Sequence, residues 1–230
     1  MPPAPVPRQP DTPAAAWFGR EATLRMLHEV QRQAIPELTR VFGHTGLYLR
    51  PTPALAPVLS GNMLANVVSL HRGGEGFTGD LACRDGQLPI ASGCVSLVYG
   101  LFVLETSAAP TALLEEVARV LKPEGVAILL TLNPWSPVRL RWGFRGLVAR
   151  DPAAVAADVR AAGLEVQRRR GVGPLWSSSK AVDLAVRGRD HPWSGLRMAS
   201  LLVARRRDPG MTPLRAGSPA LQFRPGMSAG

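Results

Sequence analysis

The stretch ARVLKPEGVAILLTLNP, residues 118–134, constrains the fold more than any other part of this chain. It begins as the end of an amphipathic helix, stops at Lys-Pro-Glu-Gly, and continues as an apolar run to Asn-Pro. A strand that is apolar at consecutive positions is buried on both faces, which is typical of a parallel sheet covered by helices. The stretch therefore predicts a helix, a tight turn at residues 122–125 and a central strand that ends at Asn133-Pro134.

Helical and strand patterns alternate along the rest of the chain. Helices are predicted at residues 17–35, ended by Pro36, at 111–121, and at 153–162 between Asp151-Pro152 and Gly163. Strands are predicted at residues 45–50, 66–72, 77–84, 94–100, 126–132, 164–170 and 198–207, with a proline-limited connection at 53–60. This alternation predicts an α/β fold with a doubly wound, mostly parallel sheet. In such sheets ligands bind outside the carboxyl ends of the strands.

The length of 230 residues fits one domain with tails. Residues 1–14 are rich in Pro and Ala and residues 208–230 in Pro, Gly and Ser, which predicts disordered tails around a domain at 15–207. The first residues lack the apolar core of a secretory signal, and no apolar run approaches the roughly 20 residues that span a bilayer. Two cysteines among apolar residues are predicted to be free thiols. Together these features predict a cytoplasmic protein.

The charge is distributed unevenly along the chain. Residues 1–134 carry 10 basic and 11 acidic side chains, whereas residues 135–230 carry 17 basic and 6 acidic ones. An excess of this kind favours an anionic partner, such as a phosphate-bearing molecule, an acidic protein or an anionic membrane surface. The alternative is that the arginine triplets at 168–170 and 205–207 are only solvated strand ends.

The segment LPIASGCVSLVYGLFVLE, followed by ALLEEVARVLKPEGVAILLTLNP, resembles the second half of the class I S-adenosylmethionine-dependent methyltransferase domain. The residues that match the family pattern in order and spacing are Leu88, Pro89, Leu104, Glu105, Glu116, Arg119, Val120, Leu121, Lys122, Pro123 and Gly125. The endings NPWSPVRLRW and LLVARRR resemble a small bacterial subgroup of these proteins. The resemblance implies a Rossmann-like methyltransferase sheet with an antiparallel last strand, and S-adenosylmethionine as the cofactor.

The chain departs from this family where the cofactor binds. Members place a glycine-rich loop after the first strand, because the backbone must approach the cofactor closely. Here that place holds GLYLRPTPAL, and Pro51 and Pro53 remove two backbone donors. The acidic residue that binds the ribose at the end of the second strand is also missing, since SLHRGGEG has His71 and Arg72 there.

The resemblance nevertheless implies a set of cofactor-binding positions, which are Leu49, Arg50, Pro51 and Thr52, Asp85 with Leu88, and Gly100 with Leu101. The substrate side is predicted to contain Phe102, Asn133 and Trp135. Each assignment has a structural alternative: Asp85 as a turn residue, Gly100 as a packing residue and Asn133 as a strand-ending turn. No catalytic residue is predicted. The four histidines are scattered, so no metal site is expected.

Three functions remain open at this point. The first is one-step methyl transfer to an unidentified acceptor, which is a small molecule or a nucleic acid. The second is a methyltransferase fold that has lost the cofactor and acts by protein or nucleic-acid interaction. The third is nucleic-acid binding through the two arginine triplets, although few aromatic residues accompany them.

Overall fold

The computed structural model describes residues 13–74, 76–143, 147–175 and 194–207. The predicted tails lie outside these residues, apart from residues 13 and 14, which belong to the first helix. The tails therefore stay a prediction, and His191 also lies outside the described residues.

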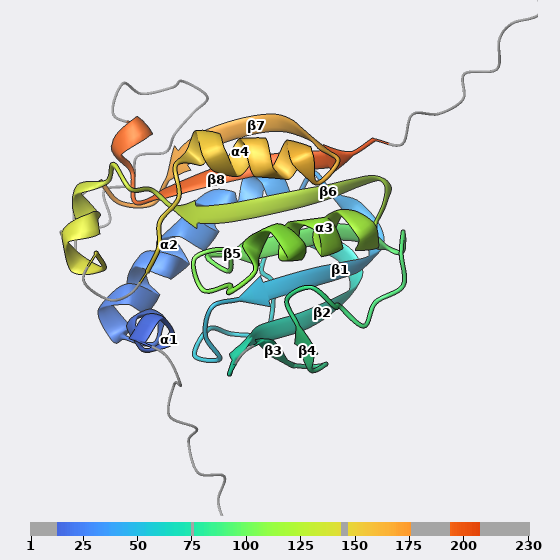
Figure 1. The fold of residues 1–230 in the computed structure, drawn as a ribbon, viewed down its shortest axis with the longest axis horizontal. Coiled ribbons are helices and arrows are strands. Elements are labelled where there is room, and N and C mark those ends of the chain that lie inside the picture. The colour runs from blue at the N-terminus through green and yellow to red at the C-terminus, as the bar shows by residue number, and fades with distance from the viewer. Residues whose placement is uncertain (1–12, 75, 144–146, 176–193, 208–230) are drawn as a thin grey trace, which may run out of the picture.

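Eight strands form one sheet in the order β4-β3-β2-β1-β5-β6-β8-β7 (Figure 1). The strands are β1 (Phe42–Arg50), β2 (Met63–Gly73), β3 (Gly76–Gly79), β4 (Cys83–Arg84), β5 (Val95–Leu101), β6 (Leu121–Leu132), β7 (Leu164–Val172) and β8 (Ala199–Arg206). The four central strands β2, β1, β5 and β6 are parallel, while β8 runs antiparallel between β6 and β7. The predicted Rossmann-like α/β sheet with an antiparallel last strand is confirmed. One further reversal occurs at β3, which forms a hairpin with β2.

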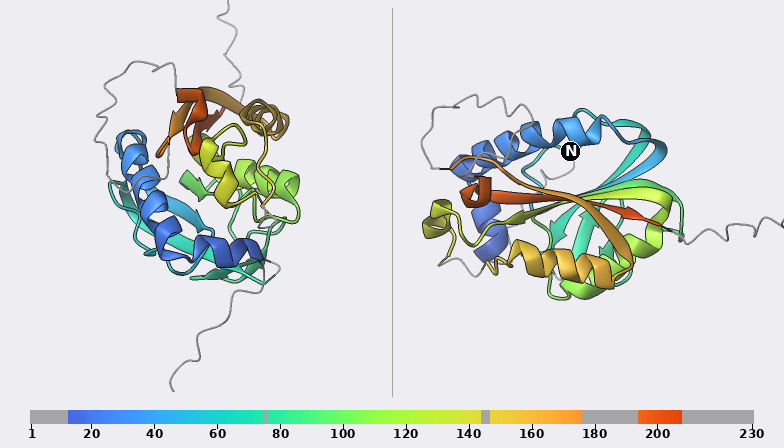
Figure 2. Two further views of the ribbon diagram at one scale, coloured as in Figure 1. Left: turned by 90° about the vertical axis from the view of Figure 1, so that its left-hand side faces the viewer. Right: turned by 90° about the horizontal axis from the view of Figure 1, so that it is seen from above.

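Helices cover both faces of the sheet (Figure 2). The helices are α1 (Pro13–Phe18), α2 (Glu21–Leu38), α3 (Pro110–Val120) and α4 (Pro152–Ala161), with short 3₁₀ turns η1 (Pro137–Arg141) and η2 (Ser194–Leu196). One apolar core lies between the sheet and α1–α2, and the other lies between the sheet and α3–α4. Neighbouring residues of β5 face opposite cores, because side chains alternate along a strand. All seven residues of β5 are buried, as a strand covered on both faces requires.

Three predicted elements differ from the structure in more than the position of an end residue. The first helix is divided between Phe18 and Glu21, and α2 continues past Pro36 to Leu38, because the Thr39 N–H still donates to the Ile35 carbonyl. The strand predicted at residues 77–84 is two short strands, β3 and β4. The predicted turn at residues 122–125 lies within β6 as an irregularity of the ladder, where Glu124 has a φ of 63°.

The connection between β1 and β2 contains no helix. It consists of residues 51–62 and runs as turns and bends, although β1 and β2 are parallel neighbours. A parallel pair is usually joined by a helix that packs on the sheet. Here Leu55 and Leu59 of the connection pack into the same core as α2. The sheet edge after β1 therefore has no helix N-terminus, which is the element that binds anionic or polar ligand groups in many α/β proteins.

Candidate functional site

Arg72 and Asp85 form a buried ion pair at the carboxyl ends of the strands. The Arg72 guanidinium makes a bidentate contact with the Asp85 carboxylate, through Nη1 with Oδ1 and through Nη2 with Oδ2, the second at 3.0 Å. Only 6% and 5% of the two side chains is exposed. Arg72 is the residue before the last of β2, and Asp85 directly follows β4. The antiparallel pairing of β2 with β3 and of β3 with β4 brings the two side chains together. Bidentate pairs of this kind are strong and geometrically specific.

The remaining hydrogen-bonding groups of this ion pair are also occupied. Arg72 Nε donates to Thr106 Oγ1 at 3.1 Å, and Nη2 donates to the Val103 carbonyl at 3.2 Å. Ser107 Oγ donates to Asp85 Oδ2. The Asp85 carboxylate, which the resemblance places among the cofactor-binding positions, is thus bound within the protein.

Leu88 is held by the end of α3. Its N–H donates to Glu116 Oε2 at 2.7 Å, and its carbonyl accepts from Arg119 Nη2 at 2.9 Å. Arg119 also donates to the Ile90 carbonyl at 2.9 Å. The Glu-X-X-Arg pattern at residues 116–119 therefore anchors the loop before β5, a structural role that sequence matching alone did not reveal.

The residues predicted for the altered loop are mostly buried. Leu49 lies in the core beneath α3, and Pro51 and Thr52 are buried. Arg50 is also buried, and its Nη1 donates to the Leu55 carbonyl. Thr52 Oγ1 accepts from the Ala54 N–H at 3.3 Å, so it stabilises the turn locally. Among the described residues Arg50 Nε has no hydrogen-bond partner.

The end of β5 is packed on both sides. A Cβ built on Gly100 would lie 2.9 Å from Leu129 Cδ2, which favours the packing interpretation of this glycine. Leu101 is fully buried. Phe102 has a φ of 51°, and its ring stacks on Phe18 of α1 at 5.8 Å between centroids. Helix α1 thus covers the position where the resemblance places the methyl-donor side.

Glu105 is a buried acid that sequence reasoning did not place in the site. Its Oε1 accepts from the Leu132 N–H at the end of β6, while Oε2 has no partner among the described residues. Burial raises the pKa of Glu105 to about 8, although the Leu132 N–H and the charge of Arg150 act in the opposite direction. An acidic residue that ends a mostly apolar run, residues 95–104, was the available sequence signal.

Asn133 and Trp135 have different environments. The Asn133 amide donates to the Gly195 carbonyl at 2.7 Å and to the Arg197 carbonyl at 2.8 Å, and its Oδ1 accepts from the Trp135 N–H. Asn133 therefore joins the end of β6 to the segment before β8. The Trp135 side chain points outward and is 66% exposed.

The arginine triplets are largely engaged in contacts within the protein. Arg168 and Arg170 contact the buried Glu37 of α2, at 3.0 and 3.8 Å. In the second triplet, Arg205 pairs with Glu124 and Arg207 with Glu165. These contacts favour a structural role for the triplets over a nucleic-acid interface.

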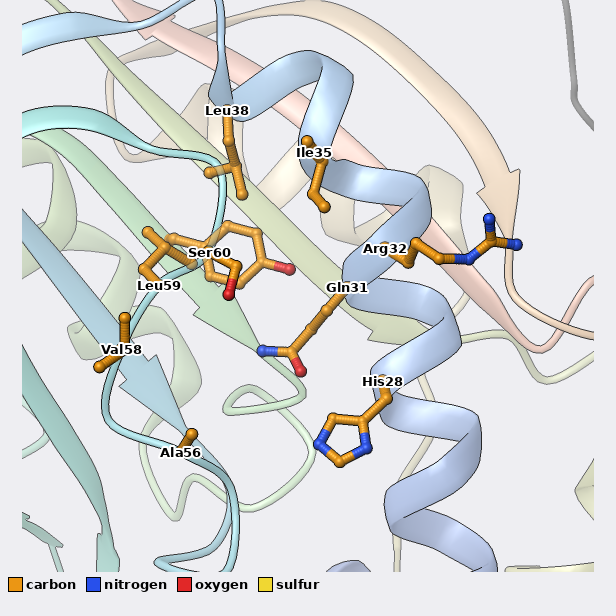
Figure 3. A pocket seen from close by; sticks show the side chains of 10 residues that line it. His28, Gln31, Arg32, Ile35, Leu38, Ala56, Val58, Leu59 and Ser60 are labelled. Atoms are coloured by element: carbon orange, nitrogen blue, oxygen red, sulfur yellow. The ribbon is translucent and has the colours of Figure 1, made fainter.

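A cavity of about 270 Å³ lies between α2 and the 51–62 connection (Figure 3). Gln31 and His28 extend into it from α2, and Val58 and Ser60 line it from the connection. The Gln31 amide donates to the Tyr48 hydroxyl. None of the predicted cofactor or substrate residues lines this cavity. A second, more open hollow of about 340 Å³ lies against residues 84–87 and the start of α3.

No group of three or more His, Cys, Asp or Glu side chains that could hold a metal ion occurs among the described residues. Within the same residues, no helix is long and apolar enough to cross a membrane.

Comparisons with known proteins identify the class of domain. Residues 56–129, about a third of the chain, match the family model of the methyltransferase domain. Malonyl-[acyl-carrier protein] O-methyltransferase from Laribacter hongkongensis is 38% identical over 68 residues, which are 29% of this chain and 23% of that protein. Over this segment the chain is thus similar to methyltransferase domains. The match to this relative spans less than a quarter of the relative's length.

Solved structures are similar in fold. A Haloferax volcanii putative methyltransferase, solved with the Trm112 activator, superposes with a TM-score of 0.54 at 15% identity, covering 84% of this chain and 95% of that chain. A putative methyltransferase from Bacillus halodurans gives 0.50 at 14% identity, covering 76% of this chain and 98% of that one. At these identities the likeness establishes the class I methyltransferase fold alone.

The residues at the strand ends do not fit S-adenosylmethionine as family members hold it. Arg72 stands where the resemblance predicts a carboxylate that binds the ribose. Its guanidinium donates hydrogen bonds to both oxygens of the Asp85 carboxylate. The turn after β1 is buried and lacks the following helix. The family match begins at residue 56, so it leaves out β1 and the turn after it but includes Arg72 and Asp85.

Proposed function

We propose that this chain catalyses the transfer of a methyl group from S-adenosylmethionine to an acceptor that is a small molecule or a nucleic acid. The observation that carries the proposal is the match of residues 56–129 to the methyltransferase domain, within a chain that has the corresponding sheet order. The hollow beside residues 84–87 supports it, because it adjoins the loop predicted to bind the adenine. In this proposal residues 15–207 form the methyltransferase domain.

In this proposal the cofactor site is closed in the ligand-free protein by the ion pair between Arg72 and Asp85. Arg72 and Asp85 satisfy each other in the structure, so Arg72 must leave the carboxylate before a nucleoside binds there. Breaking a buried ion pair has a free-energy cost because both charges lose their partner. Cofactor binding would have to offset this cost, and we therefore expect weaker affinity than an open site would give.

A second candidate function is a methyltransferase fold without a cofactor, acting through its surface. The specific observation in its favour is that the Arg72–Asp85 ion pair and the helix-free β1–β2 connection occur together. Either change alone would weaken cofactor binding, and the two together are what loss of the cofactor would produce.

Calorimetric titration with S-adenosylmethionine and S-adenosylhomocysteine separates the two functions, after a check for ligand retained through purification. We expect wild-type protein to bind with a Kd on the order of micromolar, about −8 kcal/mol. No heat at millimolar ligand, with an unchanged Tm, would instead support the surface function.

The double variant Arg72→Glu/Asp85→Asn tests the closed site directly. It removes the ion pair and places a single carboxylate, without its cationic partner, where the resemblance predicts that ribose binds. We expect at least about tenfold tighter binding, which is roughly 1.4 kcal/mol. Arg205→Gln is the control, because it removes an arginine from an exposed pair with Glu124 in the distant part of β6. Equal affinities for the double variant and wild type would contradict the closed-site proposal.

A further inference from the structure

An apolar and basic surface follows β6 at the carboxyl edge of the sheet. Three of the seven exposed large hydrophobic side chains among the described residues lie within 14 positions of the sequence. They are Trp135, Leu140 and Val148, exposed by 66%, 76% and 66%. We call these residues, with Arg139 and Arg141, the Trp135 surface. In Figure 1 it belongs to the yellow-green segment beyond the end of β6.

The backbone of this surface is anchored by its alternate residues. Val138, Trp142 and Leu147 are buried between the exposed ones. The Ser136 hydroxyl caps η1 by accepting from the Val138 N–H at 3.3 Å. These buried side chains hold the segment in place. Trp135 and Leu140 therefore cannot turn inward unless Val138 and Trp142 leave the core. The buried neighbours therefore keep these apolar side chains exposed, and exposed apolar side chains that gather on one surface mark interaction sites.

The charge of the Trp135 surface is not neutralised within the described residues. Residues 125–150 contain four arginines and no acidic residue. Arg139 and Arg141 are exposed, and neither forms an ion pair with a described acidic side chain. The arginines of the two triplets, by contrast, contact Glu37, Glu124 and Glu165. Among the described residues, Arg139 and Arg141 thus place unpaired positive charge on either side of the exposed Leu140.

We propose that the Trp135 surface binds the surface of an anionic lipid bilayer, independently of the proposed methyl transfer. Tryptophan and aliphatic side chains partition into the bilayer interface, while arginines contact anionic headgroups. A nucleic acid would use the arginines, but it would gain little from the exposed Leu140 and Val148. A second copy of the chain would bring two uncompensated positive surfaces together. The combination of apolar tips and arginines therefore favours a lipid surface.

The test is co-sedimentation of the full-length protein with phosphatidylcholine vesicles, with and without phosphatidylserine. We expect binding only when phosphatidylserine is present, and a decrease as salt is raised. Arg139→Gln/Arg141→Gln should lower the partition coefficient about 25-fold, because each arginine near an anionic surface contributes about fivefold. Trp135→Ser/Leu140→Ser should lower it by about tenfold or more.

Two matched controls distinguish binding by the Trp135 surface from binding that depends only on overall positive charge or overall exposed apolar area. Arg205→Gln/Arg207→Gln removes two arginines that are paired within the protein. Phe42→Ser/Val58→Ser removes two exposed apolar residues elsewhere. Both controls should bind vesicles as wild type does. An equal loss in the controls would overturn the proposal, as would vesicle binding that needs no anionic lipid. A different result is that the protein fails to bind vesicles but binds duplex DNA or an acidic protein, and loses that binding in Arg139→Gln/Arg141→Gln. This result would overturn the proposal in favour of that partner.

Discussion

The single buried residue Glu105 makes the free energy of unfolding depend on pH. Its carboxyl lies between the ends of β5 and β6, where only one of its oxygens accepts a hydrogen bond among the described residues. Burial raises its pKa to about 8, whereas an unfolded glutamate titrates near 4.3. The native state thus retains a proton that the unfolded state loses between about pH 4.3 and pH 8.

We expect this difference to make the free energy of unfolding decrease as pH rises through that range. The Glu105 contribution is complete below the unfolded pKa and is lost by about pH 8, with a slope approaching 1.4 kcal/mol per pH unit. Urea denaturation of wild type and Glu105→Gln at pH values from 5 to about 8 measures it. The variant cannot ionise at this position, so the difference between the two proteins should change with pH. A constant difference across the range would contradict the raised pKa.

At the scale of elements, the end of α3 fixes the loop that precedes β5. Glu116 and Arg119 bind each other and the backbone of residues 88–92, which is why the Glu-X-X-Arg pattern fits the fold without taking part in chemistry. Arg119 lowers the pKa of Glu116, chiefly through the hydrogen bond between them. The carboxylate is therefore charged near neutral pH and binds the Leu88 N–H strongly.

Glu116→Ala should lower the free energy of unfolding by about 1–3 kcal/mol, because it removes charge-assisted hydrogen bonds and leaves the Leu88 N–H without its acceptor. Glu115→Ala is the matched control, since Glu115 is exposed on the same helix turn. Urea denaturation should show little change for the control. Hydrogen exchange at Leu88 should become faster in the Glu116 variant only. Equal effects of the two substitutions would show that the loop does not depend on Glu116.

Across the whole molecule, a charged contact links segments far apart in the chain. Glu37 at the end of α2 accepts from Arg168 of β7, 131 residues later, and lies within 3.8 Å of Arg170. The Gln33 carbonyl also accepts from Arg170. These contacts join α2 to the edge strand of the sheet, so the first arginine triplet belongs to the architecture.

Arg168→Gln/Arg170→Gln should therefore lower stability by about 1–3 kcal/mol, because Glu37 is largely buried and would lose two cationic neighbours. Arg169→Gln, in the same triplet but exposed, should cost little. Thermal unfolding measures both. A large effect of Arg169→Gln on duplex DNA binding, with unchanged stability in the double variant, would restore the nucleic-acid interpretation of the triplet.

Several parts of the fold were predictable because they depend on local periodicity. Helix α3, the apolar strand β6 and the Asp151 cap of α4 follow from residue spacing, which reports which side of an element is buried. The end of α2 was predicted three residues early, because a proline in the last turn removes only its own N–H. Periodicity did not reveal that residues 77–84 form two strands, since both are short.

The sequence by itself determined the α/β class and the methyltransferase resemblance of the second half. These properties depend on the order and type of neighbouring residues. The tertiary structure decided which partners the predicted cofactor-binding residues have. Arg72 and Asp85 are 13 residues apart, and only the β2–β3 hairpin brings the guanidinium onto the carboxylate. Such a pair depends on how burial and hydrogen bonding are satisfied in three dimensions, and local sequence pattern does not encode it.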